Sequence, residues 1–317
     1  MEDYPRTLEE FEARFADDAA CREYLVALRW PEGRVCPRCQ SKQIWSTKRG
    51  LLACGTCGYQ GSVTAGTIFH GSRKPLKMWF RAIWWITSQK TGASALSLER
   101  VLGLGSYKTA WTWLHKLRRA MVRPGRERLC GRVEVDETYL GGSEEGVRGR
   151  QTERKALIAV ASEEKAGKRI GRIRLRRVRD ASAKSLHPFV CDCVEPGSVV
   201  HTDGWEGYSG LQEKGYQHEV TKLATHKESA SELLPRVHRV ISLLKRWLQG
   251  THQGAVRHEH LDYYLDEFTF RFNRRTSRYR GKLFYRLLQN AVAMGPTPYR
   301  NMVKHARGRP TRNHKML

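Results

Sequence analysis

Apolar residues recur every three or four positions in several stretches of the chain. In residues 7–30 they alternate with acids, and this pattern ends at Trp30-Pro31. In residues 75–86 an aromatic stripe follows Pro75, and a proline is well suited to the first turn of a helix. Such spacing is typical of helices that bury one face. We expect helices in both stretches and interpret the aromatic stripe as core rather than as a ligand platform. The stripe consists of Trp79, Phe80, Ile83, Trp84 and Ile86.

Residues 94–121 combine helical spacing with a tight turn. A short helix from Ser94 to Leu102 precedes Gly103-Leu104-Gly105, and a second helix opens at Ser106, an N-cap candidate. The pattern predicts either a helix-turn-helix that enters a DNA major groove or a plain packing unit of two helices. The exposed side of the second helix is expected to show Tyr107, Lys108, Thr112, Lys116 and Arg118.

From about residue 130 the pattern changes to β-rich runs. A helix around 182–193 precedes the last run, and a polar, glycine-rich loop over 141–154 follows the first. The predicted strands are 132–139, 155–161, 172–178 and 198–202. Three strands, a helix and a fourth strand indicate an α/β core with a mixed sheet. The helices expected after it are 235–249, 260–273 and 283–294.

The helix over 235–249 carries two stripes. The buried stripe is expected to contain Val237, Val240, Ile241, Leu244 and Leu248. A polar stripe runs beside it through His238, Ser242, Lys245 and Gln249. His238 and Lys245 therefore share one face, about 10 Å apart along the helix axis. This polar stripe is either part of a site or a solvated helix face.

Composition narrows the class of protein. The 317 residues include 57 Lys and Arg against 32 Asp and Glu, a net charge of +25, and 40% of them are hydrophobic. This balance is typical of a folded chain of about two domains with a polyanionic partner, most often nucleic acid. The N-terminus has no apolar signal region, and the most apolar stretch, residues 78–87, is short and carries Arg81. We therefore expect neither secretion nor a membrane span.

Four of the eight cysteines are paired at metal-ligand spacing. Cys36 and Cys39 form one C-x-x-C pair, and Cys54 and Cys57 form another. Together the two pairs can place four thiolates on one tetrahedral Zn²⁺ ion. Two disulfides are the alternative, which the absence of a secretory signal disfavours. The spacing predicts a structural zinc ribbon over about 33–62, with a core so small that the metal supplies its folding energy.

Two aspartates occupy strand positions that are costly for a carboxylate. Asp136 lies in an otherwise apolar strand, and Asp203 ends another strand directly before Gly204. Two such carboxylates, brought together by adjacent strands, would bind Mg²⁺ through oxygen. Such ions can activate a water or a 3′-hydroxyl at a phosphodiester. The alternative is that both aspartates only form turns at strand ends.

Five segments carry a resemblance to a known family. CPRC…CGTC, VDETYLGG, HTDGWEGY, LLKRWLQGTHQG and YYLDEFTFRFNRR resemble the zinc-ribbon group of bacterial insertion-sequence transposases with a DDE-type core. The resemblance covers the chain from its first helix to about residue 290. It implies an α/β fold, a ribonuclease H-like mixed sheet with flanking helices, preceded by a zinc ribbon and a helix-turn-helix-like segment.

The resemblance also implies a catalytic set. Asp136 of VDET matches the first acid, Asp203 of HTDG the second, and Lys245 of LLKR the lysine of the family. The third position, often Glu or Asn in relatives, falls on His238. Its alternatives are Glu228 and Glu232. The two aspartates are expected to hold Mg²⁺ or Mn²⁺, the histidine to be a third ligand or a proton shuttle, and the lysine to contact phosphate.

Such a transposase would bind the terminal inverted repeats of its element, free a 3′-hydroxyl by hydrolysis and direct it at target DNA. We expect double-stranded DNA as partner, a homo-oligomer on DNA, no membrane, and a cytoplasmic, nucleoid-associated location. The expected DNA contacts are Lys108, Lys116, Arg118, Arg274 and Arg275, with Arg271 and the arginines at 172, 174, 176 and 177. The alternatives are a non-catalytic zinc-ribbon regulator, an inactive transposase copy, and a nuclease that cuts without joining.

The expected organisation has five segments. They are an N-terminal helical segment (1–32), the zinc ribbon (33–62), a helical, helix-turn-helix-like DNA-binding segment (63–125), the ribonuclease H-like catalytic domain (126–295) and a basic C-terminal tail (296–317).

Overall fold

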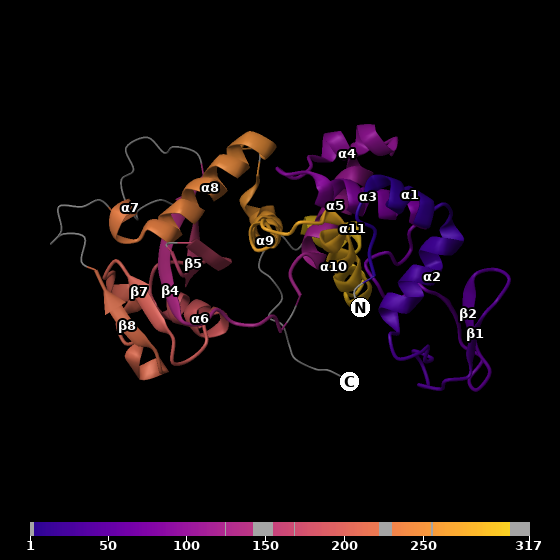
Figure 1. The fold of residues 1–317 in the computed structure, drawn as a ribbon, viewed down its shortest axis with the longest axis horizontal. Helices are drawn as coiled ribbons and strands as arrows, with labels where there is room; N and C mark the ends of the chain where they lie inside the picture. Colours follow the sequence, from indigo (N-terminus) through magenta and orange to yellow (C-terminus); the bar gives the residue numbers. More distant parts are fainter. Residues whose placement is uncertain are drawn as a thin grey trace. The chain divides into compact units, whose positions relative to one another are not determined.

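The computed structural model describes residues 3–123, 125–141, 155–167, 169–221, 230–254 and 256–304. The chain divides into two compact units (Figure 1). The helical unit joins the residues up to Arg123 with those from Thr276 onward, and the α/β unit spans Pro124–Arg275. Residues 142–154 of the predicted glycine-rich loop, Glu228, and residues 305–317 of the predicted basic tail lie outside the described residues.

The helices of the helical unit begin at side chains that cap them. The stretch predicted as one helix over 7–30 is two helices, because Asp17 starts the second: its side chain accepts the backbone N–H of Ala20 at 2.9 Å. Thr7 caps the first in the same way. The helices are α1 (Leu8–Arg14), α2 (Asp18–Arg29), α3 (Leu76–Ser88), α4 (Ala95–Leu102), α5 (Tyr107–Ala120), α10 (Arg280–Ala293) and α11 (Tyr299–Lys304).

An aromatic cluster forms the core of the helical unit. Phe80 and Trp84 of α3, Phe11 of α1 and Phe284 of α10 pack with ring centroids 4.7–5.7 Å apart. All residues of the predicted aromatic stripe are buried, so its interpretation as core is confirmed. The cluster brings α10 into the helical unit, although the sequence grouped that helix with residues 126–295. A side chain at Gly281 would collide with the backbone oxygen of Pro5, so α10 can approach the N-terminal segment only with glycine there.

The predicted zinc ribbon contains a small antiparallel sheet. Its strands, in the order β1-β2-β3, are β1 (Ile44–Ser46), β2 (Leu51–Cys54) and β3 (Gln60–Ser62). Trp45 pairs with Ala53 across the first two strands, yet its side chain is 52% exposed. Leu52 and Ala53 of β2 are buried, so the module has only a small apolar core, as expected where a metal stabilises the fold.

The α/β unit is built on a five-stranded mixed sheet. Its strands are β4 (Arg132–Leu140), β5 (Ala156–Lys165), β6 (Arg169–Val178), β7 (Val199–Thr202) and β8 (Gln217–Val220). In the order β6-β5-β4-β7-β8, the first three strands are antiparallel, whereas β7 runs parallel to both β4 and β8. The predicted ribonuclease H-like mixed sheet with flanking helices is confirmed. Strand β8 was not predicted, because this mostly polar edge strand has no apolar alternation.

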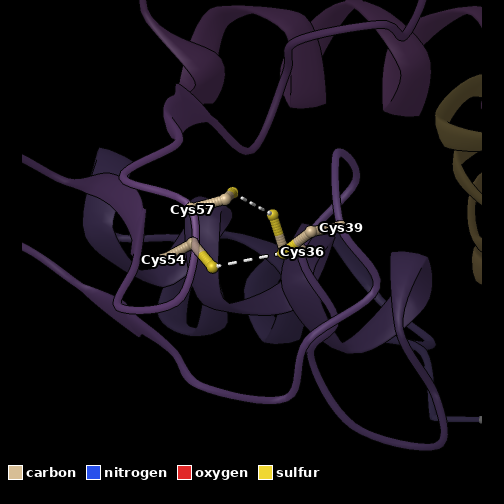
Figure 2. Close-up of side chains that lie close together, drawn as sticks. All are labelled: Cys36, Cys39, Cys54 and Cys57. Carbon is tan, nitrogen blue, oxygen red and sulfur yellow. Dashed lines mark hydrogen bonds between the residues drawn. The ribbon is translucent and has the colours of Figure 1, made fainter.

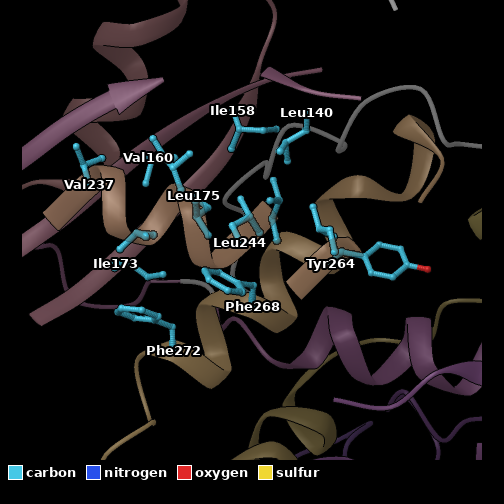
Figure 3. Close-up of a cluster of buried hydrophobic side chains, with 14 of the residues drawn as sticks. Leu140, Ile158, Val160, Ile173, Leu175, Val237, Leu244, Tyr264, Phe268 and Phe272 are labelled. Atoms are coloured by element: carbon cyan, nitrogen blue, oxygen red, sulfur yellow. The ribbon is translucent and has the colours of Figure 1, made fainter. Parts of the chain in front are cut away.

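Helices cover both faces of this sheet. Val133 and Val135 of β4 pack against α6 (Ala183–Cys193) on one face. On the other face, Leu140 joins a core with α8 (Pro235–His252) and α9 (Leu261–Phe272), which Figure 3 shows. Because side chains alternate along a strand, Glu134 and Asp136 point to the α8 face. The remaining short elements are α7 (Ala230–Leu233), η1 (Glu206–Tyr208), η2 (Gln212–Lys214) and η4 (His258–His260).

None of the described helices combines the length and the apolar character that crossing a bilayer requires.

Candidate metal centres and the sheet face beneath α8

The four cysteines of the ribbon converge on one point (Figure 2). The Sγ atoms of Cys36 and Cys57 are 3.6 Å apart, those of Cys39 and Cys54 are 3.7 Å apart, and all four lie within 4.8 Å of one another. The edge of a ZnS₄ tetrahedron with bonds of about 2.3 Å is about 3.8 Å, whereas a disulfide needs about 2.05 Å. The cluster therefore fits a Zn²⁺ ion and not two disulfides.

The backbone around these cysteines prepares them to bind a cation. Each pair is followed by a residue in the left-handed region, Gln40 with φ 61° and Gly58 with φ 68°, which turns the chain back over the sulfur atoms. The backbone N–H groups of Cys57 and Thr56 point at the Cys54 sulfur and lower the pKa of that thiol to about 6. A thiolate is the form that ligates zinc, so at Cys54 the turn favours the ligand state.

Asp136 and Asp203 lie level with each other on neighbouring strands of the α/β sheet. Strands β4 and β7 are parallel, and Glu134 pairs with His201. Two residues further along the same register, Asp136 lies level with Asp203, which directly follows β7. The oxygen Oδ1 of Asp136 accepts the N–H of Glu137 at 2.8 Å, and Oδ1 of Asp203 accepts that of Trp205 at 3.0 Å. Each aspartate thus has one oxygen bonded to its own turn or strand.

His238 faces the same two aspartates from α8. Its Nε2 is 3.5 Å from Oδ2 of Asp136, and the charge of Asp203 also acts on its ring. Burial lowers the pKa of His238 below its ordinary value, against the opposing effect of Glu134 and Asp203. The imidazole is therefore neutral at pH 7, and 3.5 Å is too long for a hydrogen bond. A neutral ring at this distance can share a cation with the carboxylate.

The rest of α8 follows the sequence pattern. The predicted buried stripe coincides with the buried residues of the helix. Lys245 is exposed, and its charge contributes to the low pKa of His238, so the two side chains lie on one side of the helix. Glu232, one alternative for the third position, is exposed on α7.

A buried carboxylate fixes α8 against the sheet. Glu134 is 1% exposed and accepts the backbone N–H groups of Arg236 and Val237, both at 2.8 Å. It also accepts Nη1 of Arg236 at 2.8 Å. The N-cap residue Leu234 offers no side-chain bond, and Pro235 at the first position has no N–H to satisfy. Glu134 on β4 therefore acts as the cap of a distant helix, and its negative charge suits the helix N-terminus.

This cap sets the position of the predicted catalytic residues. Glu134 and Asp136 are two residues apart on β4, and Arg236 and His238 are two residues apart on α8. The bonds between Glu134 and Arg236 therefore bring Asp136 and His238 together. Sequence reasoning missed Glu134, although its position in the VEVDET run, two residues before Asp136, indicates the same strand face.

The residue types on this face fit a divalent metal, although they are not closely gathered. Among the described residues, only the four cysteines form a group of three or more ligands within 4.8 Å of one another. Two carboxylates with a neutral imidazole are nevertheless a donor set that Mn²⁺ and Mg²⁺ accept, with Mn²⁺ more tolerant of nitrogen.

A cavity of about 780 Å³ opens in the α/β unit close to Asp203 in the chain. Trp205 and Tyr139 line it with their rings, and Lys155 and Arg179 line it with positive charge. Trp205 is held there by its indole N–H, which donates to the carbonyl of Ala181 at 2.7 Å. Asp180 and Glu206 line it as well, so the cavity is partly aromatic and carries charges of both signs, and its lining residues Leu157 and Ala181 belong to the α6 face of the sheet.

Several predicted DNA contacts have other roles in the structure. The expectation that Arg118 is exposed is wrong: its side chain is 2% exposed, because it follows Leu114 by one turn on the buried face of α5. Lys108 is exposed and Lys116 is half-buried. Arg275 donates to the carbonyls of Gly171 and Ile170, which ties the end of α9 to β6, and Arg274 lies over the ring of Phe270.

The arginines of β6 also have partners inside the α/β unit. Arg172 pairs at 2.8 Å with Glu163, which is fully buried, and Arg174 is 4% exposed. Arg176 pairs with Asp192 at 2.9 Å. Although burial opposes the charge, the Arg172 guanidinium lowers the pKa of Glu163 to about 2. These arginines therefore stabilise the sheet rather than form an exposed surface.

Comparisons with known proteins agree with this geometry. Residues 128–273 match the family model of the ISXO2-like transposase domain, and residues 16–60 match that of the transposase zinc-ribbon domain. An uncharacterized protein in transposable element ISH50 of Halobacterium salinarum is 26% identical over 218 residues, which cover 63% of this chain and 71% of that protein. No solved structure matches the chain significantly. The matched ranges contain the four clustered cysteines and the sheet face beneath α8.

The cysteine cluster predicts one zinc ion per chain. Chelation, or Cys36→Ser together with Cys39→Ser, is expected to unfold the ribbon and leave the α/β unit folded, because zinc binding supplies the ribbon's folding energy. Elemental analysis and circular dichroism measure the two effects. The matched control is Cys130→Ser with Cys191→Ser, which removes two cysteines outside the cluster and keeps the zinc. Purified protein without zinc would contradict the prediction.

The Glu134 cap predicts a large loss of stability in its variant. Glu134→Ala removes the buried carboxylate that Arg236 and two helix N–H groups share, so the α/β unit is expected to lose about 3–5 kcal/mol of unfolding free energy. The control is Glu164→Ala, which removes the other partner of the same arginine at a site 28% exposed. That change is expected to cost about 0–1 kcal/mol. Urea unfolding measures the free energy of unfolding of both variants. Equal losses would show that the Glu134 cap contributes no more to stability than the partly exposed Glu164.

Proposed function

The chain carries the two domains of a zinc-ribbon insertion-sequence transposase, and from this premise we propose that it cuts DNA at the ends of its element and joins the freed ends to target DNA. The observation that carries the proposal is the convergence of Asp136, Asp203 and His238 on one face of the sheet. These residues belong to three elements that the fold holds together. Their donor atoms suit the metal-dependent chemistry of a phosphodiester.

Each residue has a definite task in this proposal. Asp136 and Asp203 would hold Mg²⁺ or Mn²⁺, with His238 as the third ligand. When bound, such ions stabilise charge on the phosphate and lower the pKa of an attacking water or hydroxyl. Lys245, which is exposed on α8, would contact a phosphate oxygen next to the reacting one.

The reaction consists of two substitutions at phosphorus. In the first, water attacks, the bond from phosphorus to the 3′-oxygen breaks, and a 3′-hydroxyl is released. In the second, this hydroxyl attacks a phosphodiester of target DNA, so one phosphodiester forms as another breaks and no energy source is consumed. Neutral His238 beside Asp136 is a suitable acceptor for the proton of either nucleophile if it is not a metal ligand.

We further propose that the ribbon and the helical segment bind the terminal inverted repeats, and that the protein acts as a homo-oligomer on nucleoid DNA in the cytoplasm.

The proposal is tested by a joining assay with a DNA duplex that ends in the element's inverted repeat. Asp136→Asn and Asp203→Asn are each expected to lower cutting and joining by at least about 10³-fold, since each removes a metal-binding charge. Asp192→Asn, at a position 61% exposed, is the matched control and is expected to keep both steps. Wild-type protein that binds DNA without cutting it would indicate a regulator or an inactive copy, and cutting without joining would indicate a nuclease.

His238 has a test of its own. Because nitrogen ligands favour Mn²⁺ over Mg²⁺, wild-type cutting is expected to be stronger with Mn²⁺, and His238→Glu is expected to restore activity with Mg²⁺. Electron paramagnetic resonance of bound Mn²⁺ provides a readout that does not depend on turnover. If His238→Ala binds Mn²⁺ and cuts like the wild type, the third position moves to Glu228 or Glu232.

A further inference from the structure

A second cavity, of about 340 Å³, lies within the helical unit. Its walls come from three parts of the chain: the segment before α3, with Arg73 and Lys74, helix α5, with Lys108 and Lys116, and Tyr299 at the start of α11. We propose that this cavity binds a backbone phosphate of duplex DNA and anchors the helical unit to DNA independently of sequence. The inference rests on the proposed function and assigns one of its DNA contacts.

The charge of the cavity points to an anion. Four cations line it, and none of its described lining residues is acidic. Like charges held together repel one another, and a phosphate between them relieves that repulsion. Burial lowers the pKa of Lys116, so part of the cost of removing water from this ammonium group is already met before a ligand arrives.

The cavity is also rigid. Trp79 and Trp113, which both line it, stack with ring centroids 3.6 Å apart. The indole N–H of Trp79 donates to Oγ of Ser72 at 2.8 Å. Lys108 sits 4.2 Å over the ring of Tyr299, and Lys116 is 5.9 Å from the ring of Trp79. The aromatic rings therefore hold the ammonium groups in place, which lowers the entropy lost on binding.

The first turn of α5 adds to the positive potential. Lys108 and Thr109 of this turn line the cavity, and the N-cap residue Ser106 makes no side-chain capping bond. The positive end of a helix dipole favours an anion. Hydroxyls and recessed cations match the oxygens of a phosphate better than flat base edges, which need side chains that project into a groove.

The test compares two pairs of exposed cations in the helical unit. Arg73→Ala with Lys74→Ala removes two charges from the cavity, and Lys90→Ala with Arg100→Ala removes two exposed charges that do not line it. The dissociation constant of the full-length protein is measured against salt concentration for two duplexes of equal length. One carries the element's end and the other an unrelated sequence. Circular dichroism verifies that both variants are folded.

The cavity pair is expected to weaken binding to both duplexes by about tenfold near 0.15 M salt and to reduce the salt slope by about 0.9 for each phosphate that the protein no longer neutralises. The control pair is expected to change neither quantity as much. An unchanged slope, an equal effect of the control pair, or a weakening confined to the element's end would each overturn the inference. A wild-type protein that neither cuts nor joins DNA would refute the proposed function while leaving this result standing.

Discussion

The bond between Glu134 and the first turn of α8 is the constraint on which the candidate catalytic face depends. It is a buried carboxylate that satisfies two helix N–H groups and one guanidinium. Such a group is stable only while all its partners are present, because a lone buried charge is costly. The helix can therefore pack in one register only. That register places His238 opposite Asp136.

The two units of the fold do not simply follow one another along the chain. The α/β unit is inserted between α5 and α10 of the helical unit, and Phe284 returns to an aromatic core that begins at Phe11. Both ends of the inserted unit therefore connect to one helical body. This arrangement gives the helical unit two covalent connections to the unit that carries the candidate catalytic residues.

The positive charge of the chain is divided between two uses. In β6 and at the end of α9 the arginines pair with acids or carbonyls of their own unit and stabilise the sheet. In the cavity of the helical unit the cations have aromatic neighbours and no carboxylate among the described lining residues. Net charge alone does not distinguish these two groups. Only the cations that line the cavity of the helical unit still favour the binding of an external anion.

The sequence by itself determined the features that depend on local spacing: the two cysteine pairs, the buried stripe of α8, the mixed sheet, and two aspartates whose strands the register aligns. Tertiary structure alone decided that Glu134 caps a helix about 100 residues away, that α10 belongs to the helical unit, and that β8 extends the sheet. The exposure of Arg118 was misjudged although its spacing places it on the buried face of α5. Periodicity reveals which face of an element is buried, but not which partner buries it, because that partner is chosen by packing between segments far apart in the chain.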